Sequence, residues 1–124
     1  MKIFILEDNN FKKDDIVEAL NEYFKEGFKL EHRECLEEAV KYITENDYDL
    51  IVSDMHLPVD AKNNYTKKGA FELLKHAKKP LVIVSSRRID DSQVESENYL
   101  GSVKYDLYDD AWRADLKVYL SMLK

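Results

Sequence analysis

The sequence predicts an α/β fold, with a doubly wound, five-stranded parallel sheet and helices on both of its faces. Short continuous apolar runs alternate along the chain with segments whose apolar residues recur every three or four positions. Strands that alternate with helices form right-handed crossovers and therefore a parallel sheet. The length of 124 residues is enough for one hydrophobic core and too short for two. We therefore expect a single domain over residues 1–124.

The first half of the chain contains three predicted strands and two predicted helices. The opening apolar run is followed by Ile16, Leu20 and Phe24 at helical spacing, with Asn9 or Asn10 available as the N-cap and Gly27 as a stop. A second helix and two further strands follow from the same periodicities. The predicted strands are 3–6, 28–32 and 48–53, and the predicted helices are 11–24 and 36–43.

The second half repeats the alternation after a loop that runs from Pro58 to about Lys68. The segment 87–98 is rich in charge and has only Ile89 and Val94 as apolar anchors, and we expect a short helix there. Trp112 begins the buried face of the last helix. The predicted strands are 81–84 and 100–104, and the predicted helices are 70–77, 87–98 and 112–123.

Composition excludes several classes of protein. The net charge of −6 argues against a surface built for nucleic acid or for anionic membranes, so we expect neither as a partner. A lone Cys35 can form neither an internal disulfide nor a structural zinc site. No apolar run is long enough for a signal peptide or a bilayer span. These features predict a soluble, cytoplasmic protein.

The chemistry is expected at the carboxyl ends of the strands, where open parallel sheets bind their ligands. The first strand ends in Glu7 and Asp8, the third in Asp54, the fourth in Ser85 and the fifth in Lys104. Three carboxylates in a partly dry crevice repel one another unless they share a cation, and oxygen-only ligands suit Mg²⁺. The added hydroxyl and ammonium groups favour an anion that also touches the metal, and phosphate fits best.

This set of strand ends resembles the receiver domain of bacterial two-component response regulators (CheY-like). The resemblance rests on the two acids after the first strand, on Asp54 within 50-LIVSDMHLP-58, on Ser85 and on Lys104, in that order. It covers essentially the whole chain, whose length is that of a bare receiver with no effector attached. It implies a flavodoxin-like sheet with strand order 2-1-3-4-5.

The resemblance also implies roles for these residues. Asp54 would be the phosphoacceptor, and Asp8, Asp54 and the backbone carbonyl of His56 would hold Mg²⁺, with Glu7 helping through a water. The hydroxyl of Ser85 and the ammonium of Lys104 would each bind a phosphoryl oxygen. Such a domain catalyses at most its own phosphorylation and dephosphorylation.

The implied partners are those of phosphorelay signal transduction. The donor would be a histidine kinase or a histidine phosphotransfer protein, and phosphorylation would switch binding to a downstream protein target. Receivers often dimerise near their last helix, so a homodimer through the Trp112 region belongs to the same expectation. We also hypothesise a partner contact at Lys62, Lys67 and Lys68 in the long loop.

Two positions depart from the receiver pattern. Tyr105 stands where the family usually has Pro after the active Lys, and Gly101 stands where a switch aromatic is expected. A cis bond before a non-proline residue costs about 2.5 to 4 kcal/mol, so a trans peptide is expected there. An alternative function therefore stays open, namely a degenerate receiver-like domain that acts as a phosphorylation-independent protein-interaction module.

Other enzyme classes fit less well. An Asp-nucleophile phosphatase of the haloacid dehalogenase type needs a second Asp two positions after the nucleophile, where this chain has His56. Three glycines leave no GxGxxG or P-loop motif, and no GxSxG elbow is present.

Overall fold

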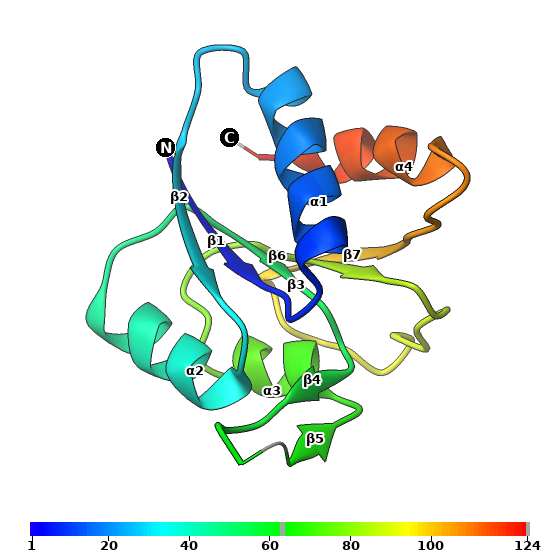
Figure 1. The fold of residues 1–124 in the computed structure, drawn as a ribbon. Coiled ribbons are helices and arrows are strands. Elements are labelled where there is room, and N and C mark those ends of the chain that lie inside the picture. Colours follow the sequence, from blue (N-terminus) through cyan, green and yellow to red (C-terminus); the bar gives the residue numbers. More distant parts are fainter. Residues whose placement is uncertain (63, 124) are drawn as a thin grey trace.

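A computed structural model describes residues 1–62 and 64–123 and shows a five-stranded parallel sheet between two pairs of helices (Figure 1). The strand order is β2-β1-β3-β6-β7, which is the predicted order 2-1-3-4-5 of the main strands. Both the fold class and the order are thus confirmed. The strands of this sheet are β1 (Lys2–Leu6), β2 (Lys29–Arg33), β3 (Leu50–Ser53), β6 (Leu81–Ser85) and β7 (Tyr99–Lys104).

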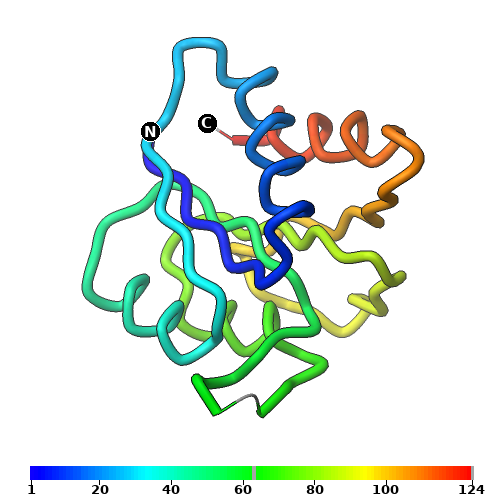
Figure 2. Tube along the Cα trace, in the orientation of Figure 1, coloured from blue at the N-terminus to red at the C-terminus, as the bar shows by residue number. Residues whose placement is uncertain are grey.

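The helices cover both faces of the sheet. The chain trace shows one pair on one face and the other pair on the opposite face (Figure 2). In the described part of the chain, no helix has the length and apolar character needed to cross a membrane. The first pair consists of α1 (Asn10–Tyr23) and α4 (Ala111–Leu120), and the second of α2 (Leu36–Glu45) and α3 (Gly69–Leu74).

Alternation along the central strands divides the interior into two cores. On β1, Ile3 and Ile5 pack with α1 and α4, whereas Phe4 and Leu6 pack with α2 and α3. All four side chains are fully buried. A strand buried on both faces reads as one continuous apolar run, which explains why the sequence revealed the central strands.

The first helix begins almost directly after β1. The side chain of Asn9 accepts a hydrogen bond from the backbone N–H of Lys12 at 3.0 Å and caps the helix, as one of the two predicted caps. The helix ends at Tyr23, and Gly27 (φ +86°) lies in the turn beyond it rather than at the helix end. The first turn of α1 therefore stands over the carboxyl end of β1.

The loop after β3 contains a small separate hairpin. The strands β4 (Leu57–Pro58) and β5 (Tyr65–Thr66) pair antiparallel, and the hairpin lies beside α3 (Figure 1). Lys62, Lys67 and Lys68 are all exposed in or next to it.

The predicted short helix over 87–98 is wrong. The described chain makes bends and turns there, and the side chain of Asp90 accepts hydrogen bonds from the backbone N–H and the hydroxyl of Ser92. Such local bonds compete with helix formation. Ile89 and Val94 still pack on the core that α2 and α3 cover, so the segment is anchored without being helical.

Gly101 lies at a register shift in β7, where Leu81 pairs with Tyr99 and Val82 pairs with Gly101. Its φ is +150°, and a Cβ at this position would overlap the ring of Tyr119 on α4. An aromatic side chain at position 101 has no room here. The ring that covers this part of β7 comes from the last helix instead.

We expect Gly101→Ala to lower the free energy of unfolding by about 2 to 4 kcal/mol, because the new Cβ meets both a strained φ and the Tyr119 ring. Gly27→Ala is the matched control, with a positive φ but open space around it, and should cost about 1 kcal/mol. Urea denaturation measures both. In the double variant with Tyr119→Ala the cost should fall below the sum of the single changes; strict additivity would contradict the overlap.

Candidate functional site

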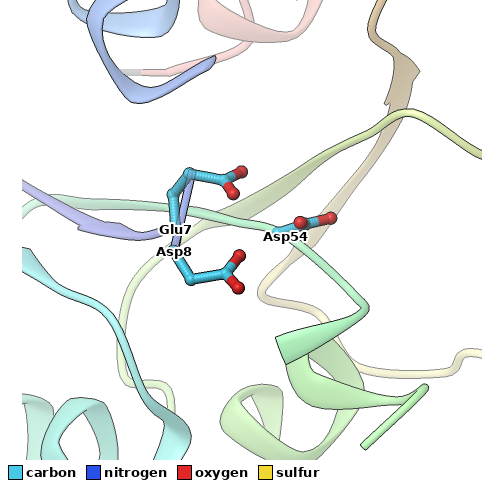
Figure 3. A group of neighbouring side chains, drawn as sticks. All are labelled: Glu7, Asp8 and Asp54. Atoms are coloured by element: carbon cyan, nitrogen blue, oxygen red, sulfur yellow. The ribbon is translucent and has the colours of Figure 1, made fainter. Parts of the chain in front are cut away.

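The ends of two neighbouring strands bring three carboxylates together. Leu6 of β1 pairs with Ser53 of β3, and the backbone N–H of Asp54 donates to the carbonyl of Leu6 at 3.0 Å. The residues that follow the two strands therefore leave the sheet side by side. One carboxylate oxygen from each of Glu7, Asp8 and Asp54 lies within 4.8 Å of the others (Figure 3).

Glu7 is the most buried of the three acids, at 1% exposure. Its Oε2 accepts a hydrogen bond from the backbone N–H of Asn9 at 3.1 Å, and a ring nitrogen of His32 lies 2.8 Å from its carbonyl oxygen. Burial raises the pKa of Glu7 to about 7, with the charge of Asp54 adding to the rise and the ammonium of Lys12 opposing it. The carboxyl group is thus held firmly in a place where its charge needs a partner.

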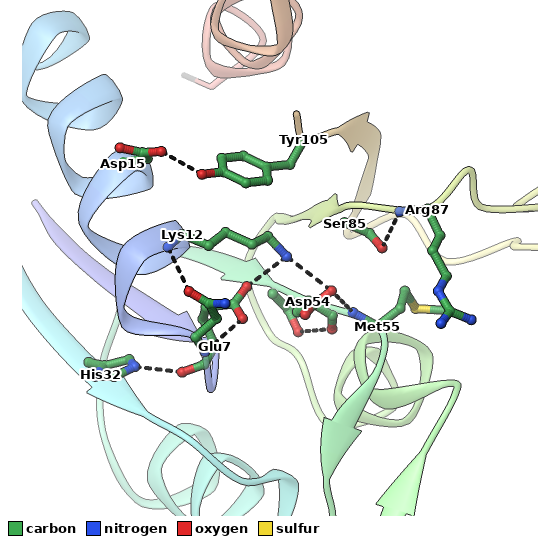
Figure 4. Close-up of polar contacts among 11 residues, drawn as sticks. Glu7, Lys12, Asp15, His32, Asp54, Met55, Ser85, Arg87 and Tyr105 are labelled. Carbon is green, nitrogen blue, oxygen red and sulfur yellow. Dashed lines mark hydrogen bonds and ion pairs between the residues drawn. The ribbon is translucent and has the colours of Figure 1, made fainter. Parts of the chain in front are cut away.

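That partner is Lys12, a residue which the sequence patterns did not single out. Its Nζ lies 2.7 Å from Glu7 Oε1 and 3.1 Å from Asp54 Oδ1, and its side chain is only 5% exposed (Figure 4). An ammonium group is rarely so buried unless it is paired. Lys12 therefore supplies a resident positive charge between two of the three carboxylates.

Helix geometry explains why Lys12 reaches the site. It lies in the first turn of α1, and side chains on a helix tilt toward its N-terminus, which here is the end of β1. The ring of Tyr105 packs beside it, with Lys12 Nζ 5.8 Å from the ring centroid. The Tyr105 hydroxyl donates to Asp15 Oδ2 at 2.5 Å, one turn farther along the same helix. Tyr105 thus connects the end of β7 to the helix that carries Lys12.

Asp54 has two chemically different oxygens. Oδ1 accepts the backbone N–H of Met55 at 2.7 Å and meets the ammonium of Lys12. Among the described residues, none donates a hydrogen bond to Oδ2. The side chain is 13% exposed, so it is both held in place and accessible. Asp54 can therefore offer an oxygen to a ligand without losing its anchors.

Ser85 and Lys104 lie at the same edge of the sheet. Ser85 ends β6, which is next to β3, and Lys104 ends β7, which is one strand farther. They are register partners at the ends of β6 and β7. Ser85 is buried, and its Oγ accepts the backbone N–H of Arg87 at 3.2 Å. Lys104 is exposed, and within the described chain the ion pairs of Asp54 involve Lys12 and not Lys104. The described chain has no cis peptide, so the bond before Tyr105 is trans, as predicted.

His56 lies two residues after Asp54, in the turn that leads into β4. Its ring meets Tyr65 of the hairpin edge to face, with 6.4 Å between the centroids. The imidazole is thus engaged with the hairpin.

A cavity of about 300 Å³ adjoins this edge of the sheet. Met55, Ser85 and the carboxylate of Asp90 line it together with four cationic side chains, so positive charge exceeds negative charge around the cavity, which suits an anion. The cationic residues are Lys67, Lys68, Arg87 and Arg88.

Comparison with solved structures shows what this arrangement of strands is similar to. The N-terminal domain of a response regulator/sensory box/GGDEF protein from Carboxydothermus hydrogenoformans superposes with a TM-score of 0.67 at 23% identity, over 98% of this chain and 92% of that one. The chain has the fold of a response regulator receiver domain. The regulator TrrA from Thermotoga maritima, solved with Mg²⁺ and BeF, gives a TM-score of 0.66 at 22% identity, over 95% and 97% of the two chains.

A two-component response regulator from Clostridium difficile has the same receiver fold, with a TM-score of 0.66 at 20% identity over 98% of this chain and 97% of that one. No protein-family model matches the chain, and no curated protein sequence does either. At these identities the neighbours establish the receiver fold alone.

The three carboxylates fit a hard divalent cation. They offer oxygen ligands close together, and the single ammonium of Lys12 leaves the cluster with excess negative charge when all three acids are ionised. Carboxylate oxygens of this kind suit the hard cations Mg²⁺, Ca²⁺ and Mn²⁺.

We expect Asp8→Asn to weaken Mg²⁺ binding by about tenfold or more, because it removes a charged ligand from the cluster. Isothermal titration calorimetry measures the affinity. Asp14→Asn is the control, since Asp14 is exposed on α1 and pairs with Lys13 outside the cluster. Equal affinities in the Asp8 variant and the unmodified protein would contradict a metal site at these carboxylates.

Proposed function

We propose that the chain is a phosphoacceptor receiver domain of a two-component system, in which Asp54 takes a phosphoryl group from a histidine kinase or a histidine phosphotransfer protein. One observation carries the proposal. Asp54 directly follows the buried strand β3, with one oxygen anchored and the other free of described donors, inside a carboxylate cluster that needs a cation. A nucleophilic carboxylate requires this combination of fixed position and access.

The proposed Mg²⁺ ligands are Asp8, Asp54 and the backbone carbonyl of His56, with Glu7 acting through a water. The burial of Glu7 and its contact with Lys12 agree with an indirect role for this acid. When bound, the metal would neutralise charge that builds up on the phosphoryl oxygens.

The chain's own groups would position the phosphoryl group. Asp54 would supply the attacking oxygen, and the hydroxyl of Ser85 would donate to a phosphoryl oxygen. The cationic cavity next to Ser85 supports an anionic donor, because it would attract and orient a phosphate before transfer. The receiver pattern gives Lys104 a phosphoryl oxygen as well, a role that its exposed position does not itself support.

Phosphorylation would act through surfaces near this edge. In this chain they comprise the non-helical segment 86–98, β7 and α4, where Tyr119 covers Gly101. A downstream protein target, or a second copy of the chain through α4, would read the change. The exposed lysines of the hairpin, Lys62, Lys67 and Lys68, are a further proposed partner contact.

Incubation with acetyl phosphate and Mg²⁺ should add one phosphoryl group per chain, detected by intact-protein mass spectrometry. Asp54→Ala should abolish the gain, because the acceptor is removed, and so should chelation of the metal. Asp49→Ala is the control, since Asp49 is exposed at the opposite end of β3. An unmodified chain that gains no phosphoryl group would contradict the proposal and favour the phosphorylation-independent interaction module.

A further inference from the structure

We infer that Lys12 on α1, in place of Lys104 at the end of β7, is the catalytic ammonium group of this site. The inference rests on the proposed function, since it assigns the positive charge that meets the phosphoryl group at Asp54. It changes which strand or helix end delivers that charge, and it gives the unusual Tyr105 a role beside Lys12.

Lys12 is in direct contact with the proposed acceptor, Asp54. Lys12 Nζ lies 3.1 Å from Asp54 Oδ1 and 2.7 Å from Glu7 Oε1, both hydrogen-bond distances for an ammonium group. The side chain is 5% exposed, so its position is fixed before any ligand arrives. A charge that is already in place costs no reorganisation when negative charge develops beside it.

Lys104 lies in solvent, away from the ion pairs of the cluster. It is exposed at the end of an edge strand, and the described ion pairs of the carboxylate cluster are made by Lys12. To meet Asp54, Lys104 would have to leave solvent and compete with an ammonium that is already bound to the same carboxylate. Lys12 needs no such rearrangement.

The position of Lys12 leaves room for a metal ion beside Asp8. Figure 3 shows the carboxylates of Glu7 and Asp8 one above the other on one side of Asp54, and Figure 4 shows the Lys12 ammonium between Glu7 and Asp54. Asp8 takes no part in the described ion pairs. The ammonium thus occupies the Glu7 side of Asp54, and the Asp8 side is left for a divalent cation.

Tyr105 packs beside Lys12 and contacts its helix. The Tyr105 ring lies near the ammonium, packs 5.1 Å from the ring of Trp112, and bonds Asp15 on α1. Tyr105, directly after β7, therefore contacts the helix that carries the charge. The Tyr at this position and the Lys on α1 form one arrangement.

The step can be written with acetyl phosphate as the donor. A carboxylate oxygen of Asp54 forms a bond to phosphorus, the P–O bond to the acetyl group breaks, and acetate leaves with the electron pair. An acyl phosphate remains on Asp54, with no net proton transfer. Lys12, adjacent to Asp54, donates a hydrogen bond to a phosphoryl oxygen and balances its charge.

The test compares rates of labelling by acetyl phosphate for three lysine variants. Lys12→Met should slow labelling by about 100-fold, as loss of a preorganised donor does. Lys104→Met should stay within about twofold of the unmodified chain. Lys13→Met is the matched control on the same turn of α1, because Lys13 pairs with exposed Asp14. Lys12→Met labelling at the unmodified rate, or an equal loss in Lys104→Met, would overturn the inference.

Mg²⁺ affinity separates a catalytic charge from a merely structural one. Removal of a neighbouring positive charge should make Lys12→Met bind Mg²⁺ about three- to tenfold more tightly, although it labels more slowly. Weaker Mg²⁺ binding together with slow labelling would mean that the site has collapsed, and would overturn the assignment.

A second variant keeps the inference testable if Lys12→Met fails to fold. If Lys12→Met does not fold, because Glu7 loses its partner, the Glu7→Gln/Lys12→Met pair removes both buried charges and should show the same loss of rate relative to Glu7→Gln. An unmodified chain that is never labelled overturns the proposed function and this inference together. Labelling that is insensitive to Lys12 overturns the inference alone.

Discussion

Repulsion among three carboxylates is the constraint on which the site depends. The parallel pairing of β1 and β3 places Glu7, Asp8 and Asp54 at one edge, and the first of them is almost completely buried. Such a cluster is stable only with positive charge nearby. Lys12 provides this charge. Its helix starts immediately after the acids, and its ammonium group contacts both Glu7 and Asp54. In the first turn of α1, the backbone of Lys12 is therefore bonded to the capping residue Asn9, and its buried ammonium group balances the charge of the acids.

The same ion pair lies beside contacts that join α1, β7 and α4 on one face of the sheet. Tyr105 at the end of β7 contacts both the helix that carries Lys12 and Trp112 of α4. A change in charge at Asp54 would act on Lys12, and Lys12 lies beside Tyr105. Packed cores respond to such changes by moving between discrete arrangements. The Tyr119 ring over Gly101 adds a further contact between β7 and α4.

Much of this architecture could be predicted from the sequence, because buried parallel strands and amphipathic helices have distinct apolar periods. The acids at the ends of β1 and β3 followed from the same patterns. Lys12 could not be found in this way, since a lysine in the first turn of a helix is normally solvated and its burial depends on tertiary contacts. The nearest signal was its place, five residues after Glu7 in a helix that begins at the strand end.

The helix predicted over 87–98 does not form, because local hydrogen bonds replace it. Its two apolar residues, Ile89 and Val94, are five positions apart and do not share a helix face, and the turn around Asp90 and Ser92 satisfies the backbone locally. Sparse apolar anchors give a helix little tertiary packing to offset that competition. The crossover between β6 and β7 is therefore built from turns, and the surface beside β7 differs from the one that a helix would have formed.

We propose that Lys12 supplies the ammonium group that meets the phosphoryl group at Asp54. The most direct measurement is a crystal structure of the chain with Mg²⁺ and beryllofluoride, a mimic of the phosphoryl group. We expect Lys12 Nζ to lie within about 3 Å of a fluorine atom while it keeps its contact with Asp54, and Lys104 to remain in solvent. A fluorine held by Lys104, with Lys12 displaced from the site, would contradict it.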